Sequence, residues 1–285
     1  MANYSHDRIV PFRDSELGKK QQIAEMFDKI AFRYDLLNRF LSGGVDMYWR
    51  KRAIRELRDG LVDQAAQRDA KAAILDVATG TGDMAVLLAR RFPQARIAGA
   101  DISEGMLEIG RQKLARLKLD NRVTLQPGDS EALPFATDTF DAITVAFGVR
   151  NFENLEKGLR EMHRVLKPGG KLVVLEFSQP RVPLICRLYR SYMRLIAPRI
   201  AGIAASNREA YRYLNDSVLA FPEGEALIHI LEGCGYTHSR LRRLSLGICS
   251  LYTGEKPGGG TREKPAGETE EKAGSGTGEK PGGRN

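Results

Sequence analysis

The chain has 285 residues, of which 42% are hydrophobic and 28% charged, and its 44 lysines and arginines outnumber 36 acidic residues to give a net charge of +8. It contains no run of about 18 apolar residues that could cross a membrane as a helix, and three cysteines spaced by 48 and 15 residues fit neither a disulfide framework nor a zinc site. The opening residues, MANYSHDRIVPFRD, lack the basic-then-apolar pattern of a signal peptide, so we expect a cytoplasmic protein.

The first part of the chain is predicted to be helical. Apolar residues recur at helical spacing from Phe27 through Ile30 and Tyr34 to Leu37. We expect residues 1–60 to form a helical lid or substrate region. Tyr34 has two interpretations: it contributes to catalysis, or it is a core aromatic in register with its apolar neighbours.

The middle of the chain alternates short apolar runs with helical patterns. Strands are predicted at 74–79, 95–101, 123–129, 140–148 and 171–177, with helices at 83–92, 103–118 and 153–166. Strands separated by helices form βαβ units, so we predict an α/β, Rossmann-like fold with a mostly parallel central sheet and helices on both faces. In such sheets ligands bind at the carboxyl ends of the strands, so the residues after each strand are the candidates for a site.

The last third of the chain contains two further helical patterns, at 183–198 and 222–234, and two strands, at 237–244 and 246–252, predicted to form an antiparallel edge. From residue 254 onward lie 10 of the 29 glycines and no aromatic residue. Such a segment cannot bury enough apolar surface to offset the entropy lost on ordering it. We therefore predict one folded domain over 1–253 and a disordered low-complexity tail over 254–285.

A glycine-rich loop follows the first predicted strand. Gly80, Thr81 and Gly82 let the backbone turn sharply, and free N–H groups at the start of the next helix face a ligand. The pattern Gly-x-Gly-x-x-Ala also satisfies a relaxed dinucleotide fingerprint, so a dehydrogenase has to be considered. Asp76 argues against it, because a carboxylate there can hold an ammonium group or order the loop but would repel a pyrophosphate. We take these four residues as cofactor-binding.

Two more predicted strand ends carry polar side chains. Asp101 ends the second strand, where a carboxylate can accept both hydroxyls of a ribose; the alternative is a helix cap, a role that Ser103 fills better. Asp129 and Ser130 end the third strand, where a carboxylate and a backbone N–H can bind the amino edge of adenine. Together the strand ends predict a pocket for ribose, adenine and a charged amino-acid tail, which is S-adenosylmethionine rather than a dinucleotide.

Five motifs, in this order, resemble those of class I S-adenosylmethionine-dependent methyltransferases: DVATGTGD, GADIS, GDSEALPF, FDAITVAFGVRN and VLKPGG. A narrower resemblance, over residues 15–253, is to the C-methyltransferases of quinone biosynthesis that act on demethylmenaquinol and 2-methoxy-6-polyprenyl-benzoquinol. It rests on FGVRN (147–151), FRYDLLNRFLSGGVDMYWRK (32–51), LEFSQP (175–180) and YRYL (211–214). The resemblance implies S-adenosylmethionine as methyl donor, and no cluster of metal-ligating residues indicates a metal.

Carried onto this chain, the resemblance implies cofactor contacts at Thr81, Asp101, Asp129 and Ser130. Ala146 stands where many members of the family have a serine, so that contact is absent.

The resemblance also implies that Arg150 and Asn151 help to deprotonate a quinol through water. Tyr34 and Asp35, in the expected helical lid, are further candidates for a catalytic role. A ring carbon attacks a sulfonium methyl group only when a neighbouring hydroxyl has lost its proton. Arginine stays protonated, so Arg150 can stabilise a phenolate but cannot act as the base. Asn151 can position a water molecule.

The implied function is methyl transfer to a ring carbon of a polyprenyl quinol, converting demethylmenaquinol into menaquinol. The alternatives are C-methylation of a benzoquinol in ubiquinone biosynthesis, methylation of another small molecule, and a non-catalytic protein that binds S-adenosylmethionine within a quinone-synthesis complex.

A stretch rich in arginine lies between residues 181 and 208, without an acidic residue, and Arg187, Arg190 and Arg194 share one helix face. A basic amphipathic helix is typical of a membrane-surface element or of a solvated face. A polyprenyl substrate favours contact with the inner face of the membrane, and a subunit contact in a homodimer is the alternative. Nucleic-acid binding is disfavoured because no aromatic platform accompanies the charge.

Overall fold

The computed structural model describes residues 4–67, 71–181, 183, 187 and 208–258. Within them seven strands form one sheet in the order β3-β2-β1-β4-β5-β7-β6. The strands are β1 (Ala73–Val77), β2 (Arg96–Asp101), β3 (Val123–Pro127), β4 (Phe140–Ala146), β5 (Leu166–Phe177), β6 (Thr237–Leu244) and β7 (Cys249–Glu255). β1 to β5 pair in parallel, and β7 pairs antiparallel with β5 and β6. The predicted mostly parallel sheet with an antiparallel C-terminal edge is confirmed.

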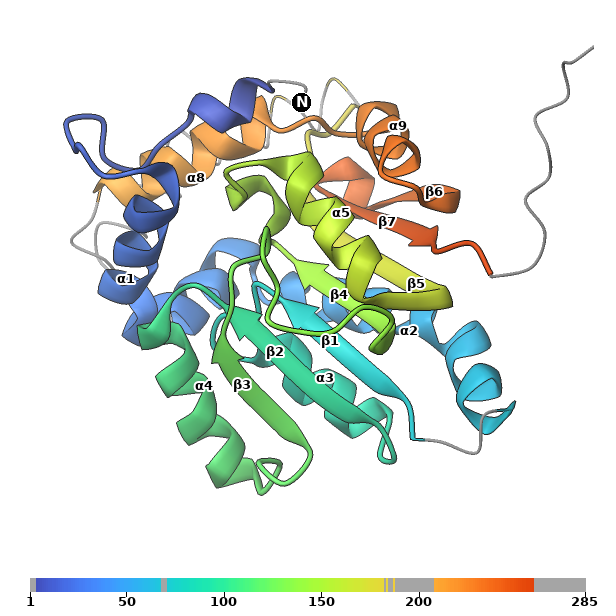
Figure 1. The fold of residues 1–285 in the computed structure, drawn as a ribbon. Coiled ribbons are helices and arrows are strands. Elements are labelled where there is room, and N and C mark those ends of the chain that lie inside the picture. The colour runs from blue at the N-terminus through green and yellow to red at the C-terminus, as the bar shows by residue number, and fades with distance from the viewer. Residues whose placement is uncertain (1–3, 68–70, 182, 184–186, 188–207, 259–285) are drawn as a thin grey trace, which may run out of the picture.

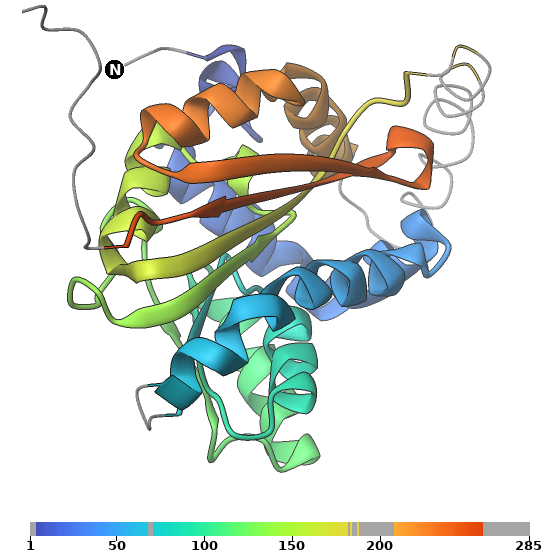
Figure 2. The ribbon, with the colours of Figure 1, turned by 90° about the vertical axis from the view of Figure 1, so that its right-hand side faces the viewer.

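Helices cover both faces of this sheet (Figures 1 and 2). One apolar core contains side chains of α2 (Val45–Gln67), α3 (Asp83–Arg91) and α4 (Glu104–Leu117), and the other contains those of α5 (Leu155–Val165) and α9 (Glu225–Gly233). Along β1, Ile74 belongs to the first core and Leu75 to the second, because successive strand side chains point to opposite faces. Because both faces of the central strands are buried, the sequences of these strands are nearly continuous apolar runs.

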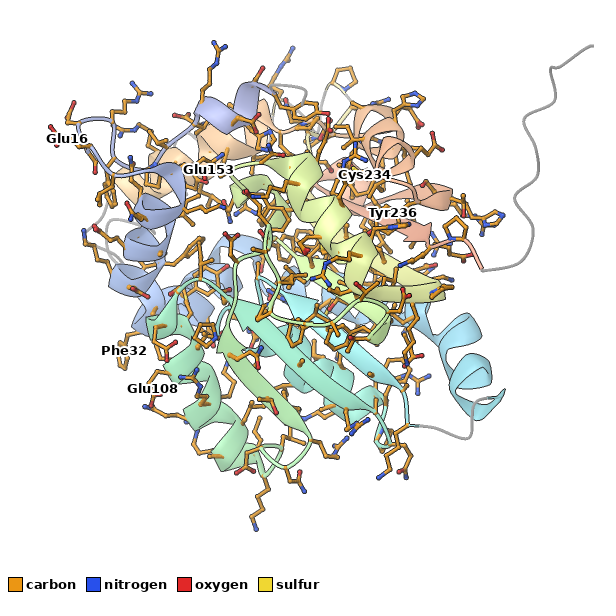
Figure 3. All side chains as sticks on the ribbon, in the orientation of Figure 1. Glu16, Phe32, Glu108, Glu153, Cys234 and Tyr236 are labelled. Carbon is orange, nitrogen blue, oxygen red and sulfur yellow. The ribbon has the colours of Figure 1, made fainter. Side chains whose placement is uncertain are left out.

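The N-terminal region is helical, as predicted. After the short η1 (Ser5–Arg8), α1 (Lys19–Ser42) lies at the end of the sheet toward which the arrowheads of β2 and β3 point (Figure 1). There α1 packs against α4, while α8 (Arg208–Ala220) contacts η1. Phe32, on α1, is 92% exposed and points away from the fold (Figure 3). The carboxyl ends of the parallel strands are thus covered by α1.

Two predicted boundaries differ from the structure near β5 and β7. β5 begins at Leu166 rather than 171, and the Gly169 N–H donates to the carbonyl of Lys256 at 2.8 Å. β7 continues to Glu255, so the predicted domain boundary at 253 falls inside a strand. Backbone pairing with β5 orders this polar sequence, because ladder hydrogen bonds do not require apolar side chains. Residues 259–285, most of the predicted tail, lie outside the described residues.

The remaining C-terminal predictions are met in part. The strand predicted at 246–252 begins at Cys249, because η4 (Ser245–Gly247) precedes it. The helix predicted at 183–198 lies almost wholly outside the described residues, as do Arg190 and Arg194, whereas Arg187 is exposed. In the described part of the chain no helix is both long and apolar enough to cross a membrane.

Candidate active site

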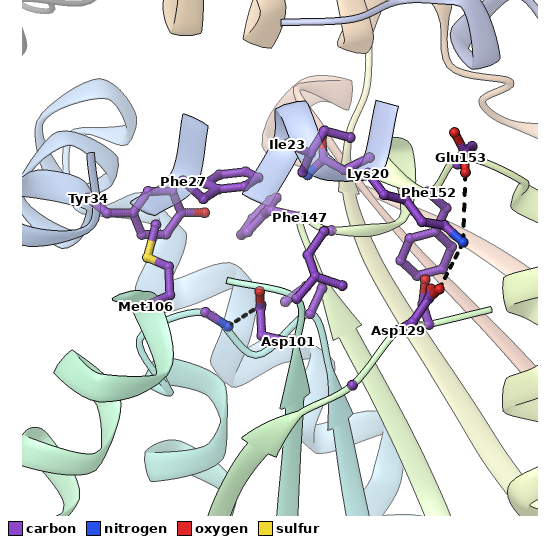
Figure 4. Close-up of a pocket in the computed structure, with 18 residues that line it drawn as sticks. Lys20, Ile23, Phe27, Tyr34, Asp101, Met106, Asp129, Phe147, Phe152 and Glu153 are labelled. Atoms are coloured by element: carbon purple, nitrogen blue, oxygen red, sulfur yellow. Dashed lines mark hydrogen bonds and ion pairs between the residues drawn. The ribbon is translucent and has the colours of Figure 1, made fainter. Parts of the chain in front are cut away.

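Two adjoining cavities lie where α1 meets the carboxyl ends of the parallel strands. The larger has a volume of about 650 Å³ and is bounded by α1 and by the loops after β1, β2, β3 and β4 (Figure 4). The smaller, of about 310 Å³, shares Tyr34, Ala78, Gly80 and Ala146 with it. This is the edge of the sheet at which the sequence predicts a ligand.

The structure brings most of the predicted site residues to these cavities. The larger is lined by Tyr34, Gly80, Asp101, Asp129, Ser130 and Asn151, and the smaller by Tyr34, Asp76, Gly80 and Thr81. Gly82 and Arg150 line neither cavity; Gly82 is instead the left-handed N-cap of α3, with a φ of +77°. Among the described residues no group of His, Cys, Asp or Glu side chains is arranged to hold a metal ion.

Asp76, near the end of β1, holds the glycine-rich loop in place through hydrogen bonds to its side chain. Its Oδ2 accepts a hydrogen bond from the Thr79 hydroxyl, and its Oδ1 accepts one from the Thr144 hydroxyl, each at 2.7 Å. Burial raises the pKa of this carboxyl to about 6. Asp76 therefore holds the loop in place and keeps a carboxylate next to the smaller cavity above pH 6.

The affinity for S-adenosylmethionine is expected to fall as the pH is lowered below about 6. The pKa of Asp76 in the free protein is about 6. A ligand ammonium group favours the charged form of Asp76, so below pH 6 the ligand can bind only if the Asp76 carboxyl group releases its proton. Calorimetry between pH 5 and 8 should show the Kd rising by up to about tenfold per pH unit below 6. The Asp76→Asn variant should bind more weakly and lose this part of the pH dependence. A flat profile for the wild type would contradict the role of Asp76.

Asp101 joins the loops after β1 and β2. Its Oδ2 accepts a hydrogen bond from the Gly80 N–H at 2.8 Å, and its Oδ1 accepts one from the Ser103 N–H at 2.9 Å. Ser103 itself caps α4, its hydroxyl accepting from the Met106 N–H at 3.2 Å. Ser103 is thus the cap of α4, and the buried Asp101 carboxylate lies at the cavity wall facing α1 (Figure 4). Ribose binding by Asp101 stays a prediction.

Lys20 ties the start of α1 to the loops after β3 and β4. Its ammonium lies 2.8 Å from Asp129 Oδ2 and 2.9 Å from Glu131 Oε2, and 3.8 Å from Glu153 Oε2 (Figure 4). Asp129, which the sequence predicts as the adenine contact, is therefore also the anchor of α1. A ligand amino group at Asp129 would have to share this carboxylate with Lys20.

Two aspartates tie the rest of α1 to the site. Asp28 accepts a hydrogen bond from the Gly105 N–H at 3.0 Å, and Asp35 accepts one from the Thr81 hydroxyl at 2.6 Å. Lys20, Asp28 and Asp35 follow one another at intervals of 8 and 7 residues, which places them on one face of the helix. Lys20 and Asp28 are not among the residues predicted from the sequence, and this spacing is the signal that could have found them.

Arg150 and Asn151 lie in a short turn, η2 (Val149–Asn151), that follows β4. Arg150 is 4% exposed, and its guanidinium lies 2.7 Å from Glu176 Oε1 in β5. Asn151 lines the larger cavity, and its Oδ1 accepts a hydrogen bond from the Tyr213 hydroxyl of α8 at 3.0 Å. The structure thus brings Asn151 and Tyr34 to the cavity and places Arg150 behind its wall. Burial raises the pKa of Tyr213, so its hydroxyl stays protonated.

Gly148 allows the loops after β1 and β4 to approach each other beside the larger cavity. A Cβ added there would overlap the Cβ of Ala78. Gly148→Ala is therefore expected to push the loops apart and to weaken cofactor binding by about 5- to 150-fold, since overpacking costs about 1–3 kcal/mol. Calorimetry would measure the Kd. Gly233→Ala, where an added Cβ meets nothing within 4 Å, is the control, and equal affinities in the two variants would contradict this role of Gly148.

The residues that line the cavities suit S-adenosylmethionine chemically. Among the residues that the structure describes, a Cβ on Gly80 would come within 4 Å of Tyr34 alone, so there is room beside the loop. The Asp101 carboxylate offers acceptors for ribose hydroxyls, while Ile23, Phe27 and Met106 supply an apolar wall.

Comparison with known proteins assigns the chain to a family. Residues 16–256 match the model of the ubiE/COQ5 methyltransferase family. A demethylmenaquinone methyltransferase from Bacteroides fragilis is 42% identical over 256 residues, which are 89% of this chain and all of the relative. The ubiquinone/menaquinone biosynthesis C-methyltransferase UbiE of Geotalea daltonii is 45% identical over 246 residues, 86% of this chain and all of that protein.

Solved structures support the fold. An S-adenosylmethionine-dependent methyltransferase from Thermotoga maritima, described as a possible histamine N-methyltransferase, is similar with a TM-score of 0.57 and 18% identity, over 82% of this chain and 99% of that one. At this identity the likeness concerns the fold alone, and it agrees with the class I methyltransferase architecture. Since the family model covers most of the sequence, the chain belongs to the ubiE/COQ5 methyltransferase family.

Proposed function

We propose that this protein transfers a methyl group from S-adenosylmethionine to a ring carbon of a polyprenyl quinol, converting demethylmenaquinol into menaquinol. The observation that carries the proposal is the larger cavity, which has the Asp101 carboxylate on one wall and the Asn151 amide on another. The names of the relatives from Bacteroides fragilis and Geotalea daltonii support the substrate class. A benzoquinol acceptor is the alternative that the second of these names favours.

The residues of this chain supply the surroundings in which a quinol ring becomes nucleophilic. S-adenosylmethionine supplies the methyl group as an electrophile bound to a sulfonium sulfur. Tyr213 occupies Oδ1 of Asn151, which leaves the Nδ2 amide as the group that can donate toward the cavity. A donor at that place stabilises the negative oxygen of a deprotonated quinol. As the ring carbon bonds to the methyl group, the methyl–sulfur bond breaks and S-adenosylhomocysteine is the leaving group; the ring proton then leaves to solvent and restores the aromatic ring.

In this proposal Arg150 does not touch the substrates, and it contributes to catalysis by positioning Asn151. Its guanidinium donates to the Phe147 carbonyl and to Glu176, and these contacts hold the turn that carries Asn151. Arg150 is therefore a positioning residue, while Asn151 and Tyr34 contact the substrates. Holding the sulfonium sulfur, its methyl group and the attacking ring carbon in one line accounts for most of the remaining increase in the rate of methyl transfer.

Methyl transfer from labelled S-adenosylmethionine tests the function directly. The purified full chain should label a reduced short-chain demethylmenaquinol, and a matched benzoquinol added in a parallel reaction would identify the alternative acceptor. Cofactor binding without labelling of either quinol would refute the proposal and support a non-catalytic binding protein.

Tyr213→Phe is expected to lower kcat about tenfold, because an Asn151 amide that has lost its anchor donates less well to the quinol oxygen. The pH at which kcat is half-maximal should rise by about one unit, since one pKa unit corresponds to about 1.4 kcal/mol of stabilisation of the deprotonated quinol. Tyr236→Phe is the control, because this buried hydroxyl donates to the Leu159 carbonyl away from the cavities. A loss of kcat with an unshifted pH profile would assign Tyr213 a purely structural role.

The proposed substrate also indicates where in the cell the protein acts. A polyprenyl quinol lies in the bilayer, so we expect the protein in the cytoplasm, in peripheral contact with the inner face of the membrane. Arg187 is exposed and available for anionic lipid, and the predicted partners in that contact are Arg190 and Arg194. Homodimer formation stays a prediction.

A further inference from the structure

Two arginines lie side by side at the start of α9. A Cβ added to Gly224, the N-cap of this helix, would be 3.0 Å from Nη2 of Arg243 and 3.2 Å from Nη2 of Arg181. Arg243 belongs to β6, the edge strand of the sheet, and Arg181 to the chain that leaves β5. None of these three residues lines either cavity of the candidate active site. The pair therefore has no part in the proposed methyl transfer.

Neither guanidinium group is neutralised within the described part of the chain. Nη1 of Arg243 is buried and has no hydrogen-bond partner there. No described carboxylate lies within ion-pair distance of Arg181 or Arg243, whereas the neighbouring Arg242 pairs with Glu56 at 2.8 Å. A buried donor of a charged group that lacks an acceptor is costly, so a ligand that accepts from it gains strongly.

The acidic residues on either side of Gly224 do not supply the missing negative charge. Glu223 is engaged elsewhere, because its Oε2 accepts a hydrogen bond from the Gln179 N–H at 2.7 Å. Glu225, in the first turn of α9, is exposed to solvent. The two guanidinium groups thus keep their positive charge at the surface between α9, β6 and the chain after β5.

The N-terminus of α9 adds backbone donors at the same place. Gly224 has a φ of +73°, which favours glycine, and it has no side chain that could cap the helix. The first intrahelical hydrogen bond is donated by the Ile228 N–H to the Gly224 carbonyl at 3.3 Å, so the N–H groups of residues 225–227 have no intrahelical acceptor. The positive end of the helix dipole and two guanidinium groups repel one another unless an anion lies between them.

We infer that Arg181, Arg243 and the first turn of α9 bind a phosphate group. A phosphate has enough acceptor oxygens for two guanidinium forks and for backbone N–H groups together. Helix N-termini bind phosphate through such N–H groups. Two sources carry this chemistry, a soluble phosphate ester and the headgroup of an anionic lipid.

An exposed apolar side chain lies near this site. The loop that joins β6 and β7 runs beside the chain after β5 (Figure 2), and a Cβ on Gly247 of that loop would be 3.8 Å from the backbone nitrogen of Arg181. The preceding residue, Leu246, is 66% exposed and has a φ of +59°, a conformation that is unfavourable for leucine. An apolar side chain next to a phosphate site favours a lipid headgroup as the source of the phosphate.

Calorimetry of the full chain with inorganic phosphate tests the site, with chloride at equal ionic strength as the reference. Arg243→Met should weaken phosphate binding about tenfold or more, the effect of losing a hydrogen bond to a charged group. Arg243→Lys should recover part of the loss, because an ammonium group keeps the charge but not the fork. Arg240→Met, which removes an exposed arginine from the same strand, should bind like the wild type. A wild type that does not bind phosphate, or binds it no better than Arg243→Met, would overturn the inference.

Arg181→Gln repeats the test at an exposed position, where the substitution does not disturb the packing of β6. Its affinity for phosphate should fall about threefold or more, less than for Arg243→Met because solvent screens the exposed guanidinium. An unchanged affinity in this variant would exclude Arg181 from the site and contradict the inference of a two-arginine site.

Vesicle sedimentation identifies the source of the phosphate. The wild type should bind vesicles of phosphatidylcholine mixed with phosphatidylglycerol more strongly than vesicles of phosphatidylcholine alone. Loss of this binding in Arg243→Met and in Leu246→Ser, with Arg240→Met unaffected, would assign the site to a lipid headgroup. Equal vesicle binding by all these proteins, together with loss of inorganic phosphate binding in Arg243→Met, would assign it to a soluble phosphate ester.

Discussion

Arg150→Ala is expected to lower the free energy of unfolding by about 3–5 kcal/mol, because removing one partner of a buried ion pair leaves the other charge uncompensated. Glu176 is 0% exposed, and its Oε1 lies 2.7 Å from the Arg150 guanidinium. Urea unfolding would measure the loss. Arg160→Ala is a suitable control, because the exposed Arg160 pairs with Glu156 at 3.3 Å along the same helix, where an ion pair contributes about 1 kcal/mol or less.

The double variant Arg150→Met, Glu176→Leu separates stability from activity. Apolar residues of similar volume often replace a buried ion pair without loss of stability, so the double variant should regain most of the unfolding free energy. Methyl transfer should nevertheless be about 100-fold slower, since a small displacement of a positioned group has this effect. The displaced group is Asn151, because Glu176 also accepts from the Arg150 N–H at 3.3 Å and so shapes the turn. Full activity in the double variant would contradict the positioning role of Arg150.

Asp101→Ala is expected to abolish measurable use of S-adenosylmethionine at ordinary concentrations. Removing a buried carboxylate that accepts charge-assisted hydrogen bonds costs about 2–4 kcal/mol, which weakens binding by about 30- to 1000-fold. The loss has two parts: the ribose loses its acceptor, and the Gly80 N–H loses the oxygen that holds it at 2.8 Å.

Calorimetry on Asp101→Ala and Asp101→Asn distinguishes these two parts. The asparagine keeps one acceptor oxygen without the charge, so its affinity should lie between those of the wild type and the alanine variant. Asp120→Ala, an exposed aspartate next to α4, should bind normally. An Asp101→Ala protein with unchanged affinity would exclude Asp101 from the cofactor site.

Several features of the fold could be predicted because they depend on local sequence. The apolar runs of β1 and β4 and the helical periods between them reflect burial of neighbouring residues. The same local logic placed Asp76, Asp101 and Asp129 at the carboxyl ends of consecutive parallel strands, where the structure has them. The end of β7 could not be found in this way, because the Gly254–Glu255 segment is ordered by pairing with β5 rather than by its own side chains.

The sequence alone determined the class of fold, the edge of the sheet that carries the site, and several of the polar residues there, because periodicity, turns and strand ends are local properties. Only the tertiary structure decided which of these residues reach the cavities. Lys20 meets Asp129 across 109 positions of sequence, and that contact exists only once α1 has packed over the sheet. In the same way Arg150 is a buried partner of Glu176 rather than a free cation at the site, because the turn after β4 directs its side chain toward β5.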